Sequence, residues 1–185
     1  QFMSLRENFD TTTAAGEMVL YSAANIAQFE RRQVSERASD NFQSRAERGL
    51  YNGGVLPIGY KLIPEKSGYL AVDDEQAEVV RAAFRAFEEK KTLSSAAKWL
   101  NKEGYKTKRT SQGGFKARLG HFTIDNLRCI ITNPAYIGIR TYKTKHEIKE
   151  VKAVWPPLVD ETTFRKAQDR LKRNQRRKPD SESRY

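Results

Sequence analysis

One helical pattern runs through the first quarter of the chain. It follows Asp10–Thr13, whose short oxygen-bearing side chains suit a helix N-cap, continues from about Ala14 to Arg48, and ends at Gly49. A helix of that length would extend for roughly 50 Å. No small globule covers so long a helix, so the pattern predicts one long projecting N-terminal helix.

The two halves of this helix differ in the width of their apolar face. The first half carries a wide one, made of Met18, Tyr21, Ala24 and Ile26–Phe29. After Val34 the sequence is mostly polar, and only a thin stripe continues at Ala38, Phe42 and Ala46. We expect the first half to pack on a protein domain or a partner helix, and the second half to project from it.

The rest of the chain alternates short extended and helical patterns. Residues 51–60 read as an extended linker rich in glycine and proline, and residues 60–63 and 69–72 read as the two strands of a hairpin. Apolar spacing then predicts helices at about 74–90, 95–103 and 123–132, strands at 136–142 and 148–154, and a last helix that begins after Asp160. The expected fold class is α+β and mostly helical, a winged helix-turn-helix-like domain with short β-hairpins after the long helix.

Charge is distributed unevenly along the chain. The formal net charge is +11 and the isoelectric point is near 9.8. Residues 1–30 hold one basic and four acidic groups, whereas residues 101–178 hold 20 basic and seven acidic groups. A protein this basic usually meets a polyanion, and the acidic start and basic remainder are expected to do different jobs.

The residue types also argue against several classes of protein. Cys129 is the single cysteine, so the chain has no internal disulfide and no Cys-x-x-Cys pair for zinc; it lies in an apolar run and is expected to be buried. We expect no metal, no other cofactor and a reducing compartment. The sequence has neither a membrane-span pattern nor a signal-peptide pattern, and the expected location is the cytoplasm.

The three middle helices fit a helix-turn-helix arrangement in which the helix at 123–132 is the recognition helix. Asn126 and Arg128 on this helix have the chemistry to contact base edges in the major groove. The alternative is that both residues simply form its solvated face. Residues 105–120 would be an unusually long turn or a wing, with phosphate contacts from Lys106, Lys108, Arg109, Lys116 and Arg118.

A second basic run lies near the end of the chain. Residues 170–178 carry six basic side chains in nine positions. Two interpretations stay open for this run, a contact with DNA and a tether to a further domain.

Two stretches resemble a known family. Phe9–Met18, followed by Ala27–Arg31 and then Glu36–Arg37, closely resembles the last part of the catalytic domain of the resolvase/invertase family of serine recombinases. A second set resembles the recombinase domain of the large members of that family: Pro57–Tyr60, Leu100–Tyr105, Ile130–Gly138, and Pro157–Asp160 with Phe164. Together they cover about residues 2–173.

The resemblance implies a reaction and a set of partners. In the family, a serine hydroxyl attacks a DNA phosphodiester and forms a 5′-phosphoserine link, with neither metal nor ATP. The implied partners are double-stranded DNA, a second copy in a homodimer on DNA, and a tetramer in the synaptic complex, with no membrane. Arg31 and Arg37 match auxiliary catalytic arginines, and Glu30 and Glu36 match acids that orient them. The rival interpretation is that both arginines only hold a helix–domain interface.

The sequence departs from the family pattern in two places. It lacks the Tyr-x-Arg-x-Ser segment that holds the nucleophile and the cysteines of the zinc ribbon, and it begins with Gln1 in mid-motif, as a fragment would. We therefore expect DNA binding without cleavage. The expected domains are 1–49 (the end of the catalytic domain with the long helix), 50–58 (a linker), 59–174 (the recombinase domain) and 175–185 (a basic, disordered tail).

By analogy with the small recombinases, the linker 50–58 is expected to follow the minor groove, with Gly53 and Gly54 permitting close approach. Two other functions compete with this interpretation. One is a non-catalytic DNA-binding regulator of the winged-helix type. The other is a pure oligomerisation element, in which the long helix matters and the charge is incidental.

Overall fold

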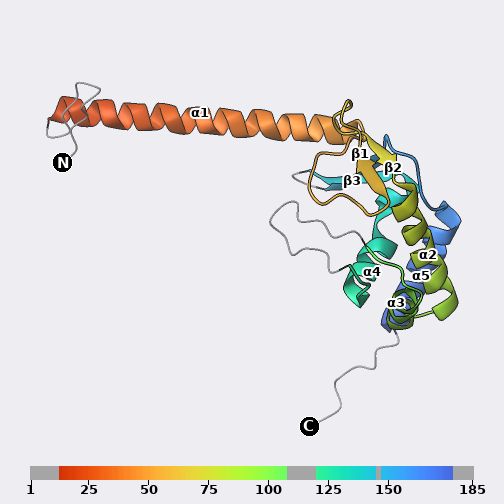
Figure 1. The fold of residues 1–185 in the computed structure, drawn as a ribbon. Coiled ribbons are helices and arrows are strands. Elements are labelled where there is room, and N and C mark those ends of the chain that lie inside the picture. The colour runs from red at the N-terminus through yellow and green to blue at the C-terminus, as the bar shows by residue number, and fades with distance from the viewer. Residues whose placement is uncertain (1–12, 108–119, 145–146, 177–185) are drawn as a thin grey trace, which may run out of the picture. The chain divides into compact units, whose positions relative to one another are not determined.

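The computed structural model describes residues 13–107, 120–144 and 147–176. These residues form five α-helices, one 3-10 helix and two antiparallel sheets of two strands each (Figure 1). The described part is therefore α+β and mostly helical, as predicted. The chain divides into two compact units, residues 1–44 and 45–185, and each is described by itself.

Helix α1, Ala14–Glu47, is one unbroken helix of 34 residues, which confirms the predicted long helix. It begins after Thr13, whose side-chain oxygen accepts a hydrogen bond from the Gly16 amide at 3.1 Å. The rest of the predicted cap and the residues before it lie outside the described residues. In unit 1 the predicted apolar face is exposed: the exposed fraction is 71% for Met18, 60% for Tyr21 and 60% for Phe29.

The last turn of α1 belongs to unit 2 and ends in a Schellman motif. The Leu50 amide donates to the Arg45 carbonyl at 3.0 Å, and the Gly49 amide donates to the Ala46 carbonyl at 2.9 Å. Gly49 has a φ of +73°, the left-handed conformation that this motif requires. The predicted end of the helix at Gly49 is thereby confirmed.

The segment predicted as a linker, residues 50–58, is irregular, but its ends are packed. Leu50, Tyr51 and Ile58 are all buried in unit 2. Strand β1, Tyr60–Leu62, then pairs with strand β2, Leu70–Val72, as the predicted hairpin. Residues 50–58 are therefore part of the folded unit rather than a spacer between two units.

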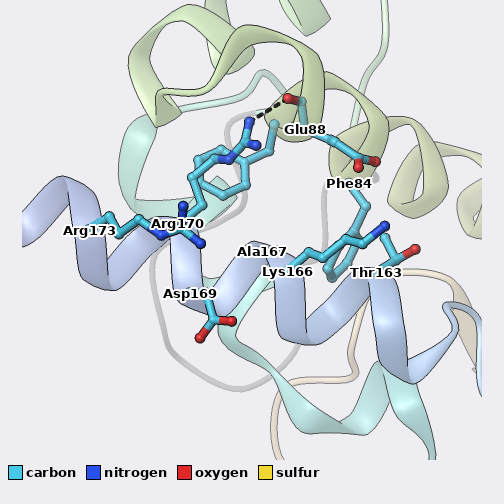
Figure 2. Close-up of a pocket in the computed structure, with 9 residues that line it drawn as sticks. Phe84, Glu88, Thr163, Lys166, Ala167, Asp169, Arg170 and Arg173 are labelled. Atoms are coloured by element: carbon cyan, nitrogen blue, oxygen red, sulfur yellow. Dashed lines mark hydrogen bonds between the residues drawn. The ribbon is translucent and has the colours of Figure 1, made fainter.

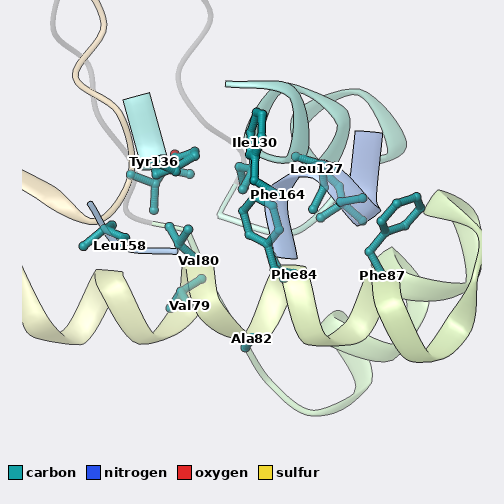
Figure 3. Close-up of a cluster of buried hydrophobic side chains, with 14 of the residues drawn as sticks. Val79, Val80, Ala82, Phe84, Phe87, Leu127, Ile130, Tyr136, Leu158 and Phe164 are labelled. Atoms are coloured by element: carbon teal, nitrogen blue, oxygen red, sulfur yellow. The ribbon is translucent and has the colours of Figure 1, made fainter. Parts of the chain in front are cut away.

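Four helices build the core of unit 2: α2 (Asp74–Lys90), α3 (Leu93–Lys102), α4 (Ile124–Thr132) and α5 (Glu161–Arg176). Helices α3, α4 and α5 all contact α2, and α4 also contacts α3 and α5. On α2, Val80, Phe84 and Phe87 recur at helical spacing and are almost fully buried (Figure 3). Each such side chain stabilises the fold by about 1.5–3 kcal/mol through removal of apolar surface from water.

Side-chain caps set where three of these helices begin. The Thr92 hydroxyl accepts from the Ser95 amide at 3.2 Å, so α3 begins two residues before the predicted start. Thr123 forms the predicted cap of α4, and an Asp160 carboxylate oxygen accepts from the Thr163 amide at 2.8 Å at the predicted start of α5.

The predicted strand at 136–142 is wrong at its beginning. Residues Pro134–Ile137 form a 3-10 helix, η1, and strand β3 covers only Ile139–Lys143. Proline at the first position of η1 and the Asn133 side chain, which accepts from the Ala135 amide at 3.0 Å, favour this helical turn. Tyr136, within this turn, is buried, and its ring stacks on that of Tyr60.

Strand β4, Ile148–Lys152, pairs antiparallel with β3 and ends two residues before the predicted end. The Ala153 amide continues this register by donating to the Gly138 carbonyl at 2.8 Å, whereas the Val154 amide donates to the Gly49 carbonyl at 3.2 Å. The chain after β4 therefore closes against the end of α1 within unit 2.

The expectation that Cys129 is buried is also wrong, because Cys129 is exposed. The apolar run around it is helical, so only Leu127, Ile130 and Ile131 point into the core. With 3.6 residues per turn, Arg128 and Cys129 fall on the opposite face of α4.

Candidate nucleic-acid interface

Helix α4, the predicted recognition helix, packs through one face only. Leu127, Ile130 and Ile131 bury that face, whereas Ile124 is 46% exposed and Arg128 is exposed on the other side. An exposed guanidinium beside an apolar side chain can donate to guanine and touch a thymine methyl group. The outer face of α4 therefore has chemistry that suits base edges.

Asn126 has a structural use at the start of α4. Its Oδ1 accepts from the Thr123 amide at 2.8 Å, while the Thr123 hydroxyl accepts from the Asn126 amide at 3.2 Å. Its Nδ2 also donates to the His121 carbonyl at 2.9 Å. This capping box leaves each amide atom of Asn126 one further hydrogen-bonding position. Asn126 is first a cap residue, and its contact with a base stays a prediction.

The basic segment predicted to contact phosphates is held at both ends. Asn101, in the last turn of α3, donates to the Phe122 carbonyl at 2.9 Å and accepts from the Phe122 amide at 2.8 Å. These two bonds join the end of α3 to the beginning of α4. Lys106 is exposed just after α3, while Lys108, Arg109, Lys116 and Arg118 lie outside the described residues.

The loop that contains Gly53 and Gly54 presents open backbone. The two glycines have φ values of +99° and +96°, and a Cβ atom at either position would meet no atom within 4 Å. Glycine is therefore required by the backbone conformation and not by crowding. The Tyr51 hydroxyl donates to the Gly54 carbonyl at 2.8 Å, which closes the loop on itself.

Arg31 and Arg37, the predicted auxiliary catalytic arginines, are exposed on α1, as are Glu30 and Glu36. Arg37 donates from Nη2 to the Gln33 side chain at 2.9 Å, one turn earlier. Among the described residues of unit 1, residues 13–44, no side chain with the chemistry of a nucleophile is bonded to either arginine, so their catalytic role stays a prediction.

The second basic run begins beside a groove between α2 and α5. Figure 2 shows Lys166, Arg170 and Arg173 of α5 along this groove, with Phe84 of α2 also lining it. Arg170 Nη1 donates to the Glu88 carbonyl at 2.6 Å, and Asn174 donates to the Lys91 carbonyl at 2.8 Å. The first residue of the run therefore anchors α5 to the end of α2; residues 177–178 lie outside the described residues.

Tyr60 and Ala135, two residues of the second resembling set, meet inside unit 2. The Tyr60 hydroxyl donates to the carbonyls of Ala135 and Pro156, at 3.2 and 2.8 Å, and the Trp155 indole donates to the same Ala135 carbonyl at 3.1 Å. Burial raises the pKa of Tyr60, so its hydroxyl remains a neutral donor. These residues fix the fold of unit 2, and the surface chemistry comes from other positions.

The family model described as Recombinase matches residues 74–174, which is more than half of the 185 residues. The chain belongs to the recombinase family. A second model, described as the resolvase N-terminal domain, matches residues 1–51 of this recombinase. Both resemblances drawn from the sequence are confirmed by these matches.

Solved structures give a consistent picture of this recombinase. A structure described as the crystal structure of an LSR–DNA complex is similar with a TM-score of 0.58 and 26% identity, over 74% of this chain and 38% of that chain. A structure from work on the sequence requirements of the Listeria innocua prophage attP site has a TM-score of 0.57 and 26% identity, over 74% and 52% of the two chains. The recombinase thus spans about two fifths and one half of these two chains. No curated protein matches it.

Sequence reasoning missed two residues that hold the segments of the candidate interface. Asn101 and Arg45 both lie in the last turn of a helix that a glycine follows, and their side chains bond to segments beyond it. A polar residue one turn before a helix-ending glycine is a weak signal for such a role.

Among the residues that the structure describes, no helix is long and apolar enough to cross a membrane.

Proposed function

We propose that this chain binds double-stranded DNA as part of a site-specific serine recombinase. The observation that carries the proposal is α4, a capped helix that packs by one face and exposes Ile124 and Arg128 on the other. The net charge of +11 supports the proposal, as does the similarity to a structure described as a complex with DNA. The parent enzyme would cut and rejoin duplex DNA through a 5′-phosphoserine intermediate.

Two contact sets follow from this proposal. Helix α4 would lie in the major groove with Arg128 toward base edges, and the loop with Gly53 and Gly54 would follow the adjacent minor groove. Lys106, together with Lys108, Arg109, Lys116 and Arg118, would neutralise phosphates. DNA footprinting tests both contact sets. If the protected DNA does not extend beyond the reach of the long helix α1, both contact sets are contradicted.

Arg31 and Arg37 would act as auxiliary catalytic residues at the scissile phosphate of the parent enzyme. The nucleophilic serine segment does not occur in this sequence, so the chain alone would bind DNA without cutting it. Metal-independent nicking by the purified chain would contradict this. The exposed Met18, Tyr21 and Phe29 on α1 support self-association, as a homodimer on DNA and a tetramer in the synaptic complex. The parent enzyme would act in the cytoplasm, on the nucleoid.

A salt titration of DNA affinity tests the proposal. Binding through about six phosphates should lose roughly three tenfold steps in affinity between 50 and 200 mM salt, because each contact releases a condensed counterion. A chain that forms oligomers and shows a flat response would instead be an oligomerisation element.

A non-catalytic winged-helix regulator would show the same salt response but needs no exposed apolar helix. Deletion of residues 1–44 distinguishes the two. In a recombinase the deletion should abolish self-association while unit 2 still binds DNA. In a regulator it should leave both properties unchanged.

A further inference from the structure

At the end of α1, the side chain of Arg45 forms hydrogen bonds with other parts of the protein. Its Nε donates to the Asn52 side-chain oxygen at 3.3 Å, and its Nη2 donates to the Tyr51 carbonyl at 3.4 Å and to the Ser67 hydroxyl at 3.2 Å. One guanidinium thus joins the loop after α1 to the turn of the β1–β2 hairpin.

The hairpin turn is shaped to receive this side chain. A Cβ atom on Gly68 would lie 2.7 Å from Arg45 Nη2 and 3.0 Å from the Tyr51 carbonyl oxygen, so only glycine leaves room. The Tyr51 amide donates to the Gly68 carbonyl at 2.8 Å. Arg45, Tyr51 and Gly68 therefore form one closely packed contact.

The Tyr51 side chain holds the loop as well. The Tyr51 ring is buried, with 8% of its surface exposed, and its hydroxyl donates to the Gly54 carbonyl at 2.8 Å. Gly53, Gly54 and Val55 are exposed, and Val55 is 57% exposed. Arg45 and Tyr51 thus hold the backbone of the loop through hydrogen bonds, while Gly53, Gly54 and Val55 face the solvent.

We infer that Arg45 is a positioning residue that, with Tyr51, holds residues 51–54 in the conformation that meets DNA. The inference rests on the proposed function, because the loop is one of its two contact sets. Two adjacent glycines have the largest conformational freedom to lose on binding. A loop already ordered in the free protein avoids that loss, and the affinity rises accordingly.

Arg45 in this role acts through geometry and not through its charge. A lysine at the position keeps the charge but cannot donate in a fork to three acceptors. Arg48 lies three residues after Arg45 and is exposed. It offers a matched control, because its replacement removes the same charge and leaves the hydrogen bonds of Arg45 intact.

The test compares Arg45→Gln, Arg45→Lys, Tyr51→Phe and the control Arg48→Gln in the full chain. Affinity for mixed-sequence duplex DNA is measured over a range of salt, and backbone order at Gly53 and Gly54 is measured by NMR relaxation without DNA. The first three variants should each bind about fivefold more weakly with an unchanged salt slope, since one hydrogen bond is worth about 1 kcal/mol. They should also lower the order parameters of both glycines.

The inference is overturned if Arg45→Lys binds like the unmodified chain while Arg45→Gln lowers the salt slope by about one, as for a phosphate contact. It is also overturned if the glycines stay equally ordered in all variants. Tyr51→Phe removes only a hydroxyl and preserves the buried ring, so it decides the matter if the Arg45 variants unfold. An unmodified chain that shows an ordered loop but no salt-dependent DNA binding refutes the proposed function, and the inference with it.

Discussion

Helices α1 and α2 have similar apolar content but opposite exposure. Phe29 of α1 is 60% exposed in unit 1, whereas Phe87 of α2 is fully buried in unit 2. Apolar spacing predicted a helix in both places, and both helices form. The difference teaches that periodicity indicates the helix and its apolar face, while burial of that face depends on what else is present to cover it.

The largest expected effect comes from truncating the two phenylalanines. Phe87→Ala should lower the free energy of unfolding of unit 2 by about 3–5 kcal/mol, because it opens a cavity in a packed core. Phe29→Ala, in unit 1, should change the free energy of unfolding of the protein by less than about 0.5 kcal/mol. Chemical denaturation at low protein concentration measures both.

The same pair distinguishes a free helix from one that is covered by a second copy. If α1 self-associates, Phe29→Ala should become destabilising as the protein concentration rises, while the effect of Phe87→Ala stays constant. Equal effects of both variants at every concentration would contradict the assignment of Phe29 to an uncovered face.

The next effect concerns the end of α1, where the exposed helix gives way to the packed unit. An added Cβ at Gly49 would lie 2.2 Å from the Lys152 carbonyl oxygen, so Gly49→Ala must displace backbone. We expect a loss of about 3 kcal/mol, since strain at a positive φ adds to the clash. Gly53→Ala, with the same sign of φ and open space, should cost only about 1 kcal/mol. Thermal unfolding of both variants tests this, and equal losses would contradict it.

A smaller effect distinguishes the helix-capping role of Asn126 from the predicted base contact of Arg128 on α4. Asn126→Ala should lower stability by about 1 kcal/mol, because it removes half of the capping box. Arg128→Ala should leave stability within about 0.5 kcal/mol and relax the preference for particular base pairs. Selection of bound sequences from a random pool, alongside thermal unfolding, checks both. A reversed pattern would make Asn126 the residue that contacts bases.

The smallest effect is the pH dependence of the α5 cap. Hydrogen bonds from Thr162 and Thr163 lower the pKa of Asp160 to about 2. Because the folded pKa lies below the unfolded one, the stabilisation is present above about pH 4 and is lost as the pH falls through about 2. Asp160→Asn should therefore lower the unfolding temperature at pH 7 and match the unmodified chain only at about pH 1, below both pKa values. A difference as large at about pH 1 as at pH 7 would mean that the carboxylate charge is not involved.

Elements with a strong local signal were predicted well from the sequence. The α1 end at Gly49, the cap residue Thr123 and the hairpin that starts at Tyr60 all follow from short-range chemistry, and the structure has each of them. Local rules suffice here because the residues that decide each feature lie within a few positions of one another.

Failures occurred where distant residues decide the outcome. Tyr136 looks like a strand residue; Asn133 and Pro134 favour the helical turn η1 locally, but the ring that Tyr136 packs on belongs to Tyr60, which lies far from it in the sequence. Arg45 and Asn101 look like ordinary solvated helix residues, and only the fold shows that they bond to Ser67 and Phe122. The amphipathic period around Cys129 was short enough to be mistaken for a fully buried run.

The shared carbonyl of Ala135 has a consequence for how the protein emerges during synthesis. Tyr60 is made early, yet its two acceptors lie 75 and 96 positions later, and Trp155 completes the set. Nascent chains that stop before Pro156 lack one of the two acceptors of the Tyr60 hydroxyl, and they also lack α5, so we expect the first hairpin to be less stable in them than in the whole of unit 2. We therefore expect unit 2 to reach its final packing late in synthesis, after its last quarter has been translated.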